Sequence, residues 1–136
     1  MTKAIIISLI VTYSKFFGVD PYVAVAVAEK ESMFKVDAVG EAGEIGIMQL
    51  MPSTYPMFTR KQLQEPHTNI MLGLMRLKEY QKNCKHKNDI DYLVCWNYGP
   101  MNANNVKYPS LFPYVKDVKK RMNKYKRTGL LASSKL

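Results

Sequence analysis

Apolar residues recur at helical spacing at the start of the chain. The pattern is Ile6, Leu9 or Ile10, Tyr13, and Phe16 or Phe17, which predicts a helix with one buried face. With Lys3 in front, the run also has the charged and apolar regions of a signal peptide, but no small-x-small cleavage site follows. It is shorter than the roughly 20 apolar residues of a membrane span. We therefore expect the first core helix here, and no export signal of the chain's own.

A second helix is predicted from Asp20-Pro21 to about Glu31. Asp is a good N-cap and Pro is favoured at the first helical position. Val, Ala and Tyr occur on every side of the helix, so we expect it at the centre of the fold. Glu29 points away from the face that carries Glu31. Because apolar surroundings disfavour an ionised carboxylate, Glu31 is predicted to hold a proton near neutral pH, as a general acid requires.

The rest of the chain alternates turns with further helices. Gly40, Gly43 and Gly46 mark a tight segment with at most a small β-hairpin near residues 39–50. Further helices are expected after Pro52, from Pro66, from Asp89 to Tyr98 and from Pro113. A chain of 136 residues suffices for one core. We therefore predict a single, mainly α domain over residues 1–127, followed by a flexible tail over 128–136.

The net charge of +9 is concentrated near the C-terminus. Residues 107–136 contain nine Lys or Arg and one acid, Asp117, whereas residues 1–106 are almost balanced. The apolar residues Val115, Val118, Met122 and Tyr125 recur there at helical spacing, so we expect a helix with one docked stripe and a cationic face. That face is either merely solvated, or attracted to a polyanion such as phosphate-rich wall polymer, lipopolysaccharide or nucleic acid.

The chain has two cysteines, Cys84 and Cys95. They could form a bridge in an oxidising compartment, but the sequence does not show their geometry. We expect reduced, largely buried thiols. His86 lies close to Cys84, yet the three residues lack a fourth ligand, so no metal site is predicted.

Several short motifs follow one another in a familiar order. They are Glu31-Ser32, Gly46-Ile47-Met48-Gln49, Glu65-Pro66 through Asn69-Ile70 to Gly73, Cys95-Trp96-Asn97-Tyr98-Gly99, and Tyr114-Val115 with Val118. This series resembles the lytic transglycosylases of the soluble (Slt) type, relatives of goose-type lysozyme, with the motifs E-S, G-x-M-Q and A-Y-N-x-G. The likeness covers about residues 5 to 120 and implies an α+β, lysozyme-like fold.

The resemblance also implies a reaction. The substrate would be peptidoglycan, cut between N-acetylmuramic acid and N-acetylglucosamine without a cofactor. Two carboxylates are the common arrangement for glycoside cleavage, but in this family the C6 hydroxyl of the substrate attacks the anomeric carbon. Glu31 would then be the sole acid and base, and a 1,6-anhydro ring would form.

Other site residues are carried over by motif. Gln49 is expected as a hydrogen-bonding group in the cleft and Met48 as its apolar wall; a solvated Gln and a packed Met are the alternatives. Tyr114 matches a tyrosine that points its hydroxyl into the cleft, unless it is a core aromatic. Asn97 is also a candidate substrate-binding residue, but a structural role is the favoured interpretation, because a buried amide commonly fixes nearby backbone.

The chain departs from the family pattern near the cleft. Trp96 stands where a tyrosine usually hydrogen-bonds the catalytic glutamate; an indole N–H can donate to a carboxylate and its face can stack on a sugar. Gly40 occupies the position of a serine in the family pattern, and Glu44 occupies the position of an alanine. A cleft-facing Glu44 would keep a hydrolytic outcome open, but we expect the glycine-flanked turn to point it to solvent.

The sequence therefore predicts a peptidoglycan lytic transglycosylase. A water-using muramidase and a non-catalytic glycan-binding component of a virion or secretion apparatus are the alternatives. The short length and the basic tail suggest a bacteriophage protein, present in the virion with other virion proteins or delivered to the host wall, which opens the wall as the genome enters or at lysis.

Overall fold

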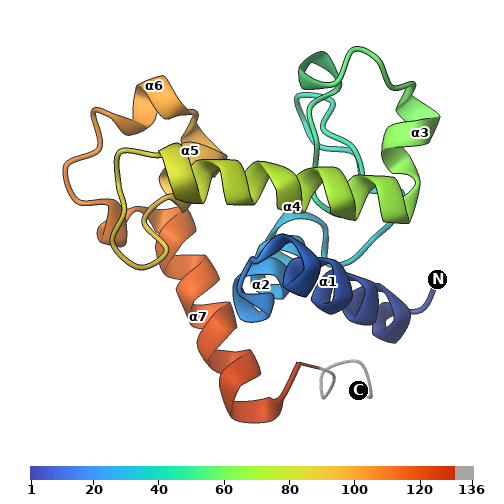
Figure 1. Cartoon of the computed structure of the whole chain (residues 1–136), viewed down its shortest axis with the longest axis horizontal. Coiled ribbons are helices and arrows are strands. Elements are labelled where there is room, and N and C mark those ends of the chain that lie inside the picture. The colour runs from blue at the N-terminus through green and yellow to red at the C-terminus, as the bar shows by residue number, and fades with distance from the viewer. Residues whose placement is uncertain (131–136) are drawn as a thin grey trace.

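The computed structural model describes residues 1–130, which form a mostly helical domain (Figure 1). In chain order its helices are α1 (Lys3–Phe17), α2 (Pro21–Ser32), the 3-10 helix η1 (Pro52–Thr54), α3 (Arg60–Gln64), α4 (Pro66–Asn83), α5 (Leu93–Tyr98), α6 (Pro100–Ala103), the 3-10 helix η2 (Pro109–Leu111) and α7 (Pro113–Thr128). Extended structure over these residues is limited to the isolated antiparallel bridges Val39–Ile45 and Ile45–Leu50. The predicted mainly α domain with a minimal hairpin is confirmed.

Helix α1 is part of the core, as its apolar spacing predicted. Thr2 caps its N-terminus by accepting a hydrogen bond from the Ile5 amide, and Gly18 ends it in the left-handed conformation. Ile6 and Ile10 are buried, whereas Phe16 is 81% exposed because the buried stripe continues through Ser14 instead. None of the helices within residues 1–130 combines the length and apolar character that a membrane crossing needs.

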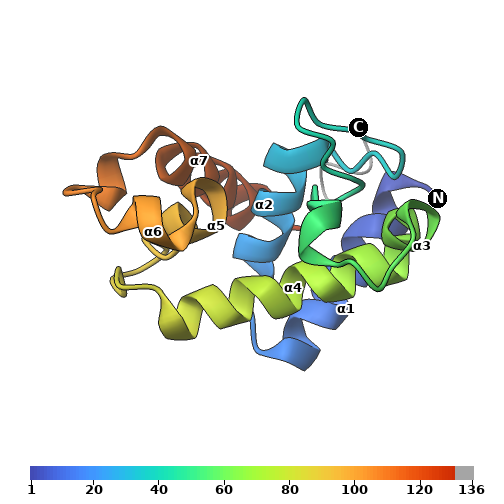
Figure 2. The same cartoon turned by 90° about the horizontal axis from the view of Figure 1, so that it is seen from above.

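Helix α2 occupies the centre of the molecule. Asp20 caps it by accepting from the Tyr22 amide, and every residue from 23 to 29 is buried. It packs against α1 on one side and α7 on the other, and Figure 2 shows it between these two helices. The apolar residues on all sides of its first turns are therefore explained by neighbours on both sides.

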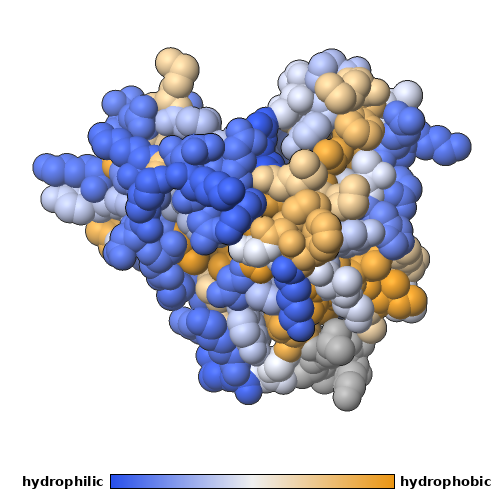
Figure 3. Space-filling view, in the orientation of Figure 1, coloured by the Kyte–Doolittle hydropathy of each residue, from blue (hydrophilic) through white to orange (hydrophobic). Residues whose placement is uncertain are grey.

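Two regions rise from opposite ends of the long helix α4. The loop that contains η1 and leads to α3 lies at one end, and α5 and α6 lie at the other (Figures 1 and 2). In the space-filling view the surface is hollowed between these regions (Figure 3). The C-terminal end of α2 reaches this hollow, so the fold brings a helix end to the base of a cleft.

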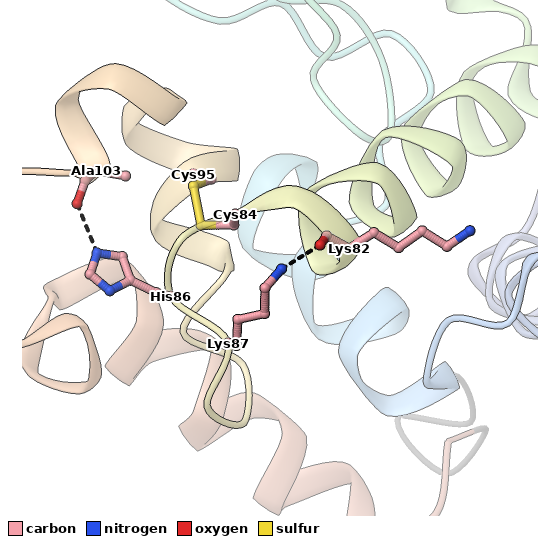
Figure 4. The surroundings of a disulfide bond; sticks show 6 residues. All are labelled: Lys82, Cys84, His86, Lys87, Cys95 and Ala103. Carbon is pink, nitrogen blue, oxygen red and sulfur yellow. Dashed lines mark hydrogen bonds between the residues drawn. A yellow bond between two sulfur atoms is a disulfide. The ribbon is translucent and has the colours of Figure 1, made fainter.

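The two cysteines form a disulfide, so the expectation of reduced thiols is wrong (Figure 4). Cys84 follows the last turn of α4 and Cys95 lies in α5; their Cα atoms are 6.1 Å apart, within the range of a bridge. Both are buried, as expected. The sequence could not show this because the intervening loop decides whether the two residues meet. His86 donates to the Ala103 carbonyl at 2.8 Å and ties the same loop to α6.

The C-terminal part agrees with the pattern in most respects. Helix α7 begins at Pro113, and the predicted apolar stripe of Val115, Val118, Met122 and Tyr125 is buried. Helix α5 begins only at Leu93, four residues later than expected, because Asp89 adopts a left-handed turn conformation (φ 50°). Most of the predicted tail, residues 131–136, lies outside the described residues, and Thr128 is still helical.

Candidate active site

Glu31 lies in the last turn of α2, where the chain turns sharply. Ser32 holds this turn: its hydroxyl donates to the Ala28 carbonyl and accepts from the Phe34 amide, each at 3.1 Å. Met33 and Phe34 both have positive φ, 52° and 64°. This left-handed conformation costs a non-glycine residue about 1–2 kcal/mol. The abrupt end of the helix leaves Glu31 at the edge of the core rather than inside it.

Two neutral side chains donate hydrogen bonds to one oxygen of Glu31. The Tyr114 hydroxyl donates to Oε2 at 2.6 Å, and the Trp96 indole N–H donates to the same atom at 3.0 Å. The indole also lies 3.0 Å from the Tyr114 oxygen. Trp96 comes from α5 and lies beside Glu31, as its position in the motif predicted. Tyr114 comes from the first turn of α7 and is a buried core aromatic whose hydroxyl reaches Glu31. Neither bond uses Oε1.

These surroundings shift the pKa of Glu31 upward. Burial raises this pKa most, the bonds from Tyr114 and Trp96 oppose the change, and the nearby Glu44 raises the pKa further. The net result is a pKa above the ordinary value for glutamate. Burial, together with the adjacent Glu31, also raises the pKa of the Tyr114 hydroxyl, which therefore remains a donor. The raised pKa of Glu31 agrees with the sequence prediction.

Glu31 lines a cleft of about 320 Å³ that lies between the two raised regions. Its lining includes Glu44, Gln49, Tyr55, Arg76, Tyr80, Trp96 and Asn97. A larger hollow of about 660 Å³ runs along α7, but it is lined mainly by lysines and by paired acids such as Asp89 and Asp117. We therefore place the candidate active site in the smaller cleft, which contains the desolvated carboxyl group.

Gln49 lies in the cleft, as predicted, but its amide nitrogen is already used. It donates to the Ala38 carbonyl at 3.1 Å and to the Gly46 carbonyl at 2.9 Å. The residue itself has positive φ, 52°. Gln49 therefore holds the glycine-rich turn together and has its Oε1 left as an acceptor.

Met48 does not form the apolar wall of the cleft. It is fully buried and packs on Gly73 of α4, where a Cβ would lie 2.6 Å from the Met48 Cγ atom. The alternative of a packed Met is the observed one. Adjacent residues point in different directions here, so Met48 enters the core while Gln49 faces the cleft.

The expected structural role of Asn97 is wrong. Asn97 is exposed and lines the cleft. The buried amide that fixes backbone is instead Asn69: its Oδ1 accepts from the Met48 amide at 2.7 Å, and its Nδ2 donates to the carbonyls of Ile45 and Leu63 at 2.9 and 2.8 Å. The sequence signal was a polar residue on the apolar face of α4, next to Ile70.

Glu44 does not point to solvent either. It lines the cleft with Glu31, and its Oε1 is buried without a hydrogen-bond partner among the described residues. The physical reason is Gly40, where a Cβ would lie 2.5 Å from the Glu44 Oε2 atom. The missing side chain at position 40 gives the Glu44 carboxylate room to fold inward.

One cleft wall was missed from the sequence altogether. The Arg76 guanidinium lies over the rings of Tyr55 and Tyr80, at 5.9 and 5.6 Å from their centres, and the Tyr80 ring meets Trp96 edge-on. Arg76 and Tyr80 are four positions apart on α4, so they share a face. This four-residue spacing is the feature of the sequence that could have indicated the wall.

Glu29 points away from the cleft face, as predicted, and it is buried against α7. It is 2% exposed and accepts from Arg121 Nη1 at 2.7 Å, from Lys124 Nζ at 2.9 Å and from the Tyr125 hydroxyl. Part of the basic face of α7 is thus turned inward. Lys119 is also paired, with Asp89 at 2.6 Å.

Fold and site together define a helical, lysozyme-like domain in which a desolvated glutamate with a raised pKa lies at a helix end, beside a cleft. The family described as the transglycosylase SLT domain matches residues 8–110, and the chain belongs to this family. Among solved structures, the lytic transglycosylase Slt from Pseudomonas aeruginosa, determined as an inactive glutamate-to-glutamine mutant, is similar with a TM-score of 0.75 and 23% identity. The match covers 92% of this chain and 24% of that one, so the chain spans about a quarter of the length of that enzyme and shares its fold.

Proposed function

We propose that this chain is a peptidoglycan lytic transglycosylase that cleaves the β-1,4 bond between N-acetylmuramic acid and N-acetylglucosamine. The observation that carries the proposal is the environment of Glu31: a carboxyl group at a cleft base, with a raised pKa and both neutral donors on one oxygen. Membership of the SLT family supports the substrate class.

In the proposed reaction Glu31 first donates its proton to the glycosidic oxygen. The bond to the anomeric carbon breaks, its electron pair stays on that oxygen, and N-acetylglucosamine leaves as an alcohol. The neighbouring N-acetyl oxygen shares the positive charge at the anomeric carbon. The C6 oxygen then bonds to that carbon while ionised Glu31 takes its proton, so the 1,6-anhydro ring forms without water.

The donors beside Glu31 suit both halves of this cycle. The hydrogen bonds from Tyr114 and Trp96 become stronger when Glu31 is ionised, because a carboxylate accepts more strongly than a neutral acid. They bind Oε2 alone, so Oε1 is the oxygen we assign to proton transfer. Gln49, Asn97 and the face of Trp96 are the cleft groups we propose to contact the sugars.

Mass spectrometry of digested sacculi tests the proposal. We expect products with 1,6-anhydro ends, lighter by one water than hydrolysis products, and none after a Glu31→Gln change. Reducing ends that carry labelled oxygen from solvent would favour a muramidase. Binding to sacculi without any cleavage would favour a non-catalytic glycan-binding component of a virion or secretion apparatus.

We propose further that the enzyme serves a bacteriophage, opening the host wall as the genome enters or at lysis, in the periplasm or cell wall. The basic face of α7 supports this through its attraction to anionic wall polymer or nucleic acid. Detection of the protein in purified virions with other virion proteins would place it at entry. Its absence from virions, together with accumulation late in infection, would place it at lysis.

A further inference from the structure

The Glu44 carboxylate is unusual among the charged groups of this molecule. Its Oε1 is buried and has no hydrogen-bond partner among residues 1–130. A carboxylate oxygen removed from water without a donor is destabilised. Within the described residues, every other buried side-chain oxygen or nitrogen has a partner. Oε1 itself is covered by protein, but Oε2 is not among the fully buried atoms and has no hydrogen bond among these residues, so a ligand in the cleft can supply a donor to the carboxylate there.

The local backbone holds this carboxylate in place. The Gly40 amide donates to the Glu44 carbonyl at 2.9 Å, and the Gly43 amide donates to the Gly40 carbonyl at 3.0 Å, which closes a tight turn around the residue. A Cβ at position 40 would meet Glu44 Oε2 at 2.5 Å and Gln49 Oε1 at 2.7 Å. The absence of a side chain at Gly40 therefore leaves the space that the Glu44 carboxylate occupies.

The groups that face Glu44 do not neutralise it. On α2 the facing group is Glu31, which is itself an acid, and on the turn it is the Gln49 oxygen. On α4 it is Arg76, but that guanidinium lies over Tyr55 and Tyr80 and within 3.7 Å of Glu79. No cation of residues 1–130 lies within 4.0 Å of the Glu44 carboxylate.

We propose that Glu44 is a specificity-determining residue that selects glycan strands with an unacetylated glucosamine, whose protonated amine binds this carboxylate. The inference rests on the proposed function and names its substrate class more closely. A carboxylate only accepts hydrogen bonds, so its ligand must donate. An acetamido N–H is a neutral donor, whereas an ammonium brings three donors and the missing positive charge.

The expected preference follows from the strength of the two bonds. A hydrogen bond to a charged partner is about twice as strong as a neutral one, which corresponds to a preference of roughly tenfold in kcat/KM. Muramic acid keeps its acetyl group in this scheme, because its N-acetyl oxygen takes part in the reaction. The selected amine therefore belongs to glucosamine.

The experiment compares cleavage of two strand preparations near pH 6, where an amine is protonated. One is fully acetylated, and the other is de-N-acetylated on glucosamine only. We expect the wild type to prefer the second about tenfold and Glu44→Gln to cleave both equally, since the amide removes the charge but keeps the shape. Glu41→Gln, at an exposed position of the same turn, is the matched control and should keep the preference.

Equal cleavage by the wild type, or a preference that survives Glu44→Gln, would overturn the inference. If Glu44→Gln does not fold, binding of glucosamine and N-acetylglucosamine oligosaccharides to Glu31→Gln protein replaces it. Tighter binding of the glucosamine oligomer, weakened by salt, supports the proposal, and equal binding refutes it. Failure of the wild type to cut either strand would refute the proposed function itself.

Discussion

Glu29 and Glu31 lie two positions apart on α2, yet their environments are opposite. Glu29 is enclosed between α2 and α7, where Arg121, Lys124 and Tyr125 donate to it. Burial alone would raise its pKa, but these bonds together lower the pKa below the ordinary value. Glu31 is also desolvated but has only neutral donors, and its pKa is raised.

The comparison teaches that the charge of the donors decides the role, more than their number. Both carboxylates are removed from water and both accept several hydrogen bonds. Cations favour the ionised form of Glu29, whereas Glu31 has Tyr114, Trp96 and a like charge at Glu44. One helix thus carries a buried anchor whose surroundings favour the ionised form, and the carboxyl group that we propose as the proton donor.

The largest expected difference is in activity, and it is measured by replacing each of the two glutamates separately with glutamine. Glu31→Gln should lower peptidoglycan cleavage by at least about a hundredfold, because a glutamine cannot transfer the proton. Glu29→Gln should keep the specific activity of the folded fraction, since Glu29 faces α7. Turbidity assays on sacculi measure both. An active Glu31→Gln protein would remove the distinction between the two glutamates.

Stability should respond in the opposite order. Glu29→Gln should lower the free energy of unfolding by about 1–3 kcal/mol, because Lys124 loses its ion pair and Arg121 keeps only its pair with Asp117. Glu31→Gln should have no such effect, since it removes the need to ionise a desolvated acid. Thermal melts of the two variants provide the measurement. A Glu29→Gln protein as stable as the wild type would contradict the proposed anchor.

The pH profiles should also diverge. The folded-state pKa of Glu29 is below the ordinary value of 4.5, so its stabilising effect is complete above that value and is lost as pH falls through the lowered pKa. The folded-state pKa of Glu31 is above 4.5, so its contribution is complete below that value and is lost as pH rises through the raised pKa. Glu29→Gln should therefore flatten the acid side of the stability profile, and Glu31→Gln the opposite side.

A smaller effect is expected when one donor of Glu31 is removed. In Tyr114→Phe the hydroxyl is lost, and because its bond lowers the pKa of Glu31, that pKa should rise further. The alkaline limb of the activity profile should move to higher pH, with a loss of about twofold to tenfold at the optimum. Initial rates across pH measure the shift. An unmoved limb, with a lower rate at every pH, would indicate a purely structural tyrosine.

The smallest effect should separate two kinds of cation on α7. Lys124 is bound to Glu29, whereas exposed Lys116 and Lys120 have no ion pair among the described residues. Lys116→Gln with Lys120→Gln should weaken retention on sacculi in low salt, where the Debye length exceeds about 10 Å, and leave the melting temperature unchanged. Lys124→Gln should lower the melting temperature. Pull-down on sacculi and thermal melts measure the two effects. A lower melting temperature after the Lys116 and Lys120 changes would contradict the distinction.

Much of the fold was predictable because its signals are local. Apolar spacing and caps located α1, α2, α4 and α7, and the motif order indicated the family. The end of an almost wholly apolar helix identified Glu31 as a group with a raised pKa. These features depend on neighbours along the chain, which the sequence contains directly.

The failures depend on side-chain contacts outside regular helices, most of them between distant segments. The Cys84–Cys95 bridge requires a loop to return, and the fixing amide proved to be Asn69 rather than Asn97. The direction of Glu44 depends on an empty volume at Gly40. The cations around Glu29 lie more than ninety positions away. Helical periodicity cannot report such pairings.

The two left-handed residues that follow the active-site helix carry a consequence for improving this protein. Met33 and Phe34 hold a conformation that glycine adopts freely. A glycine at position 33 would relieve the strain, so a search for heat-tolerant variants should find it readily. Yet the same change would let the helix end drift away from Tyr114 and Trp96. Proteins commonly lose activity when such strained segments are relaxed. Here thermal stability and activity would depend in opposite directions on the backbone conformation of one residue.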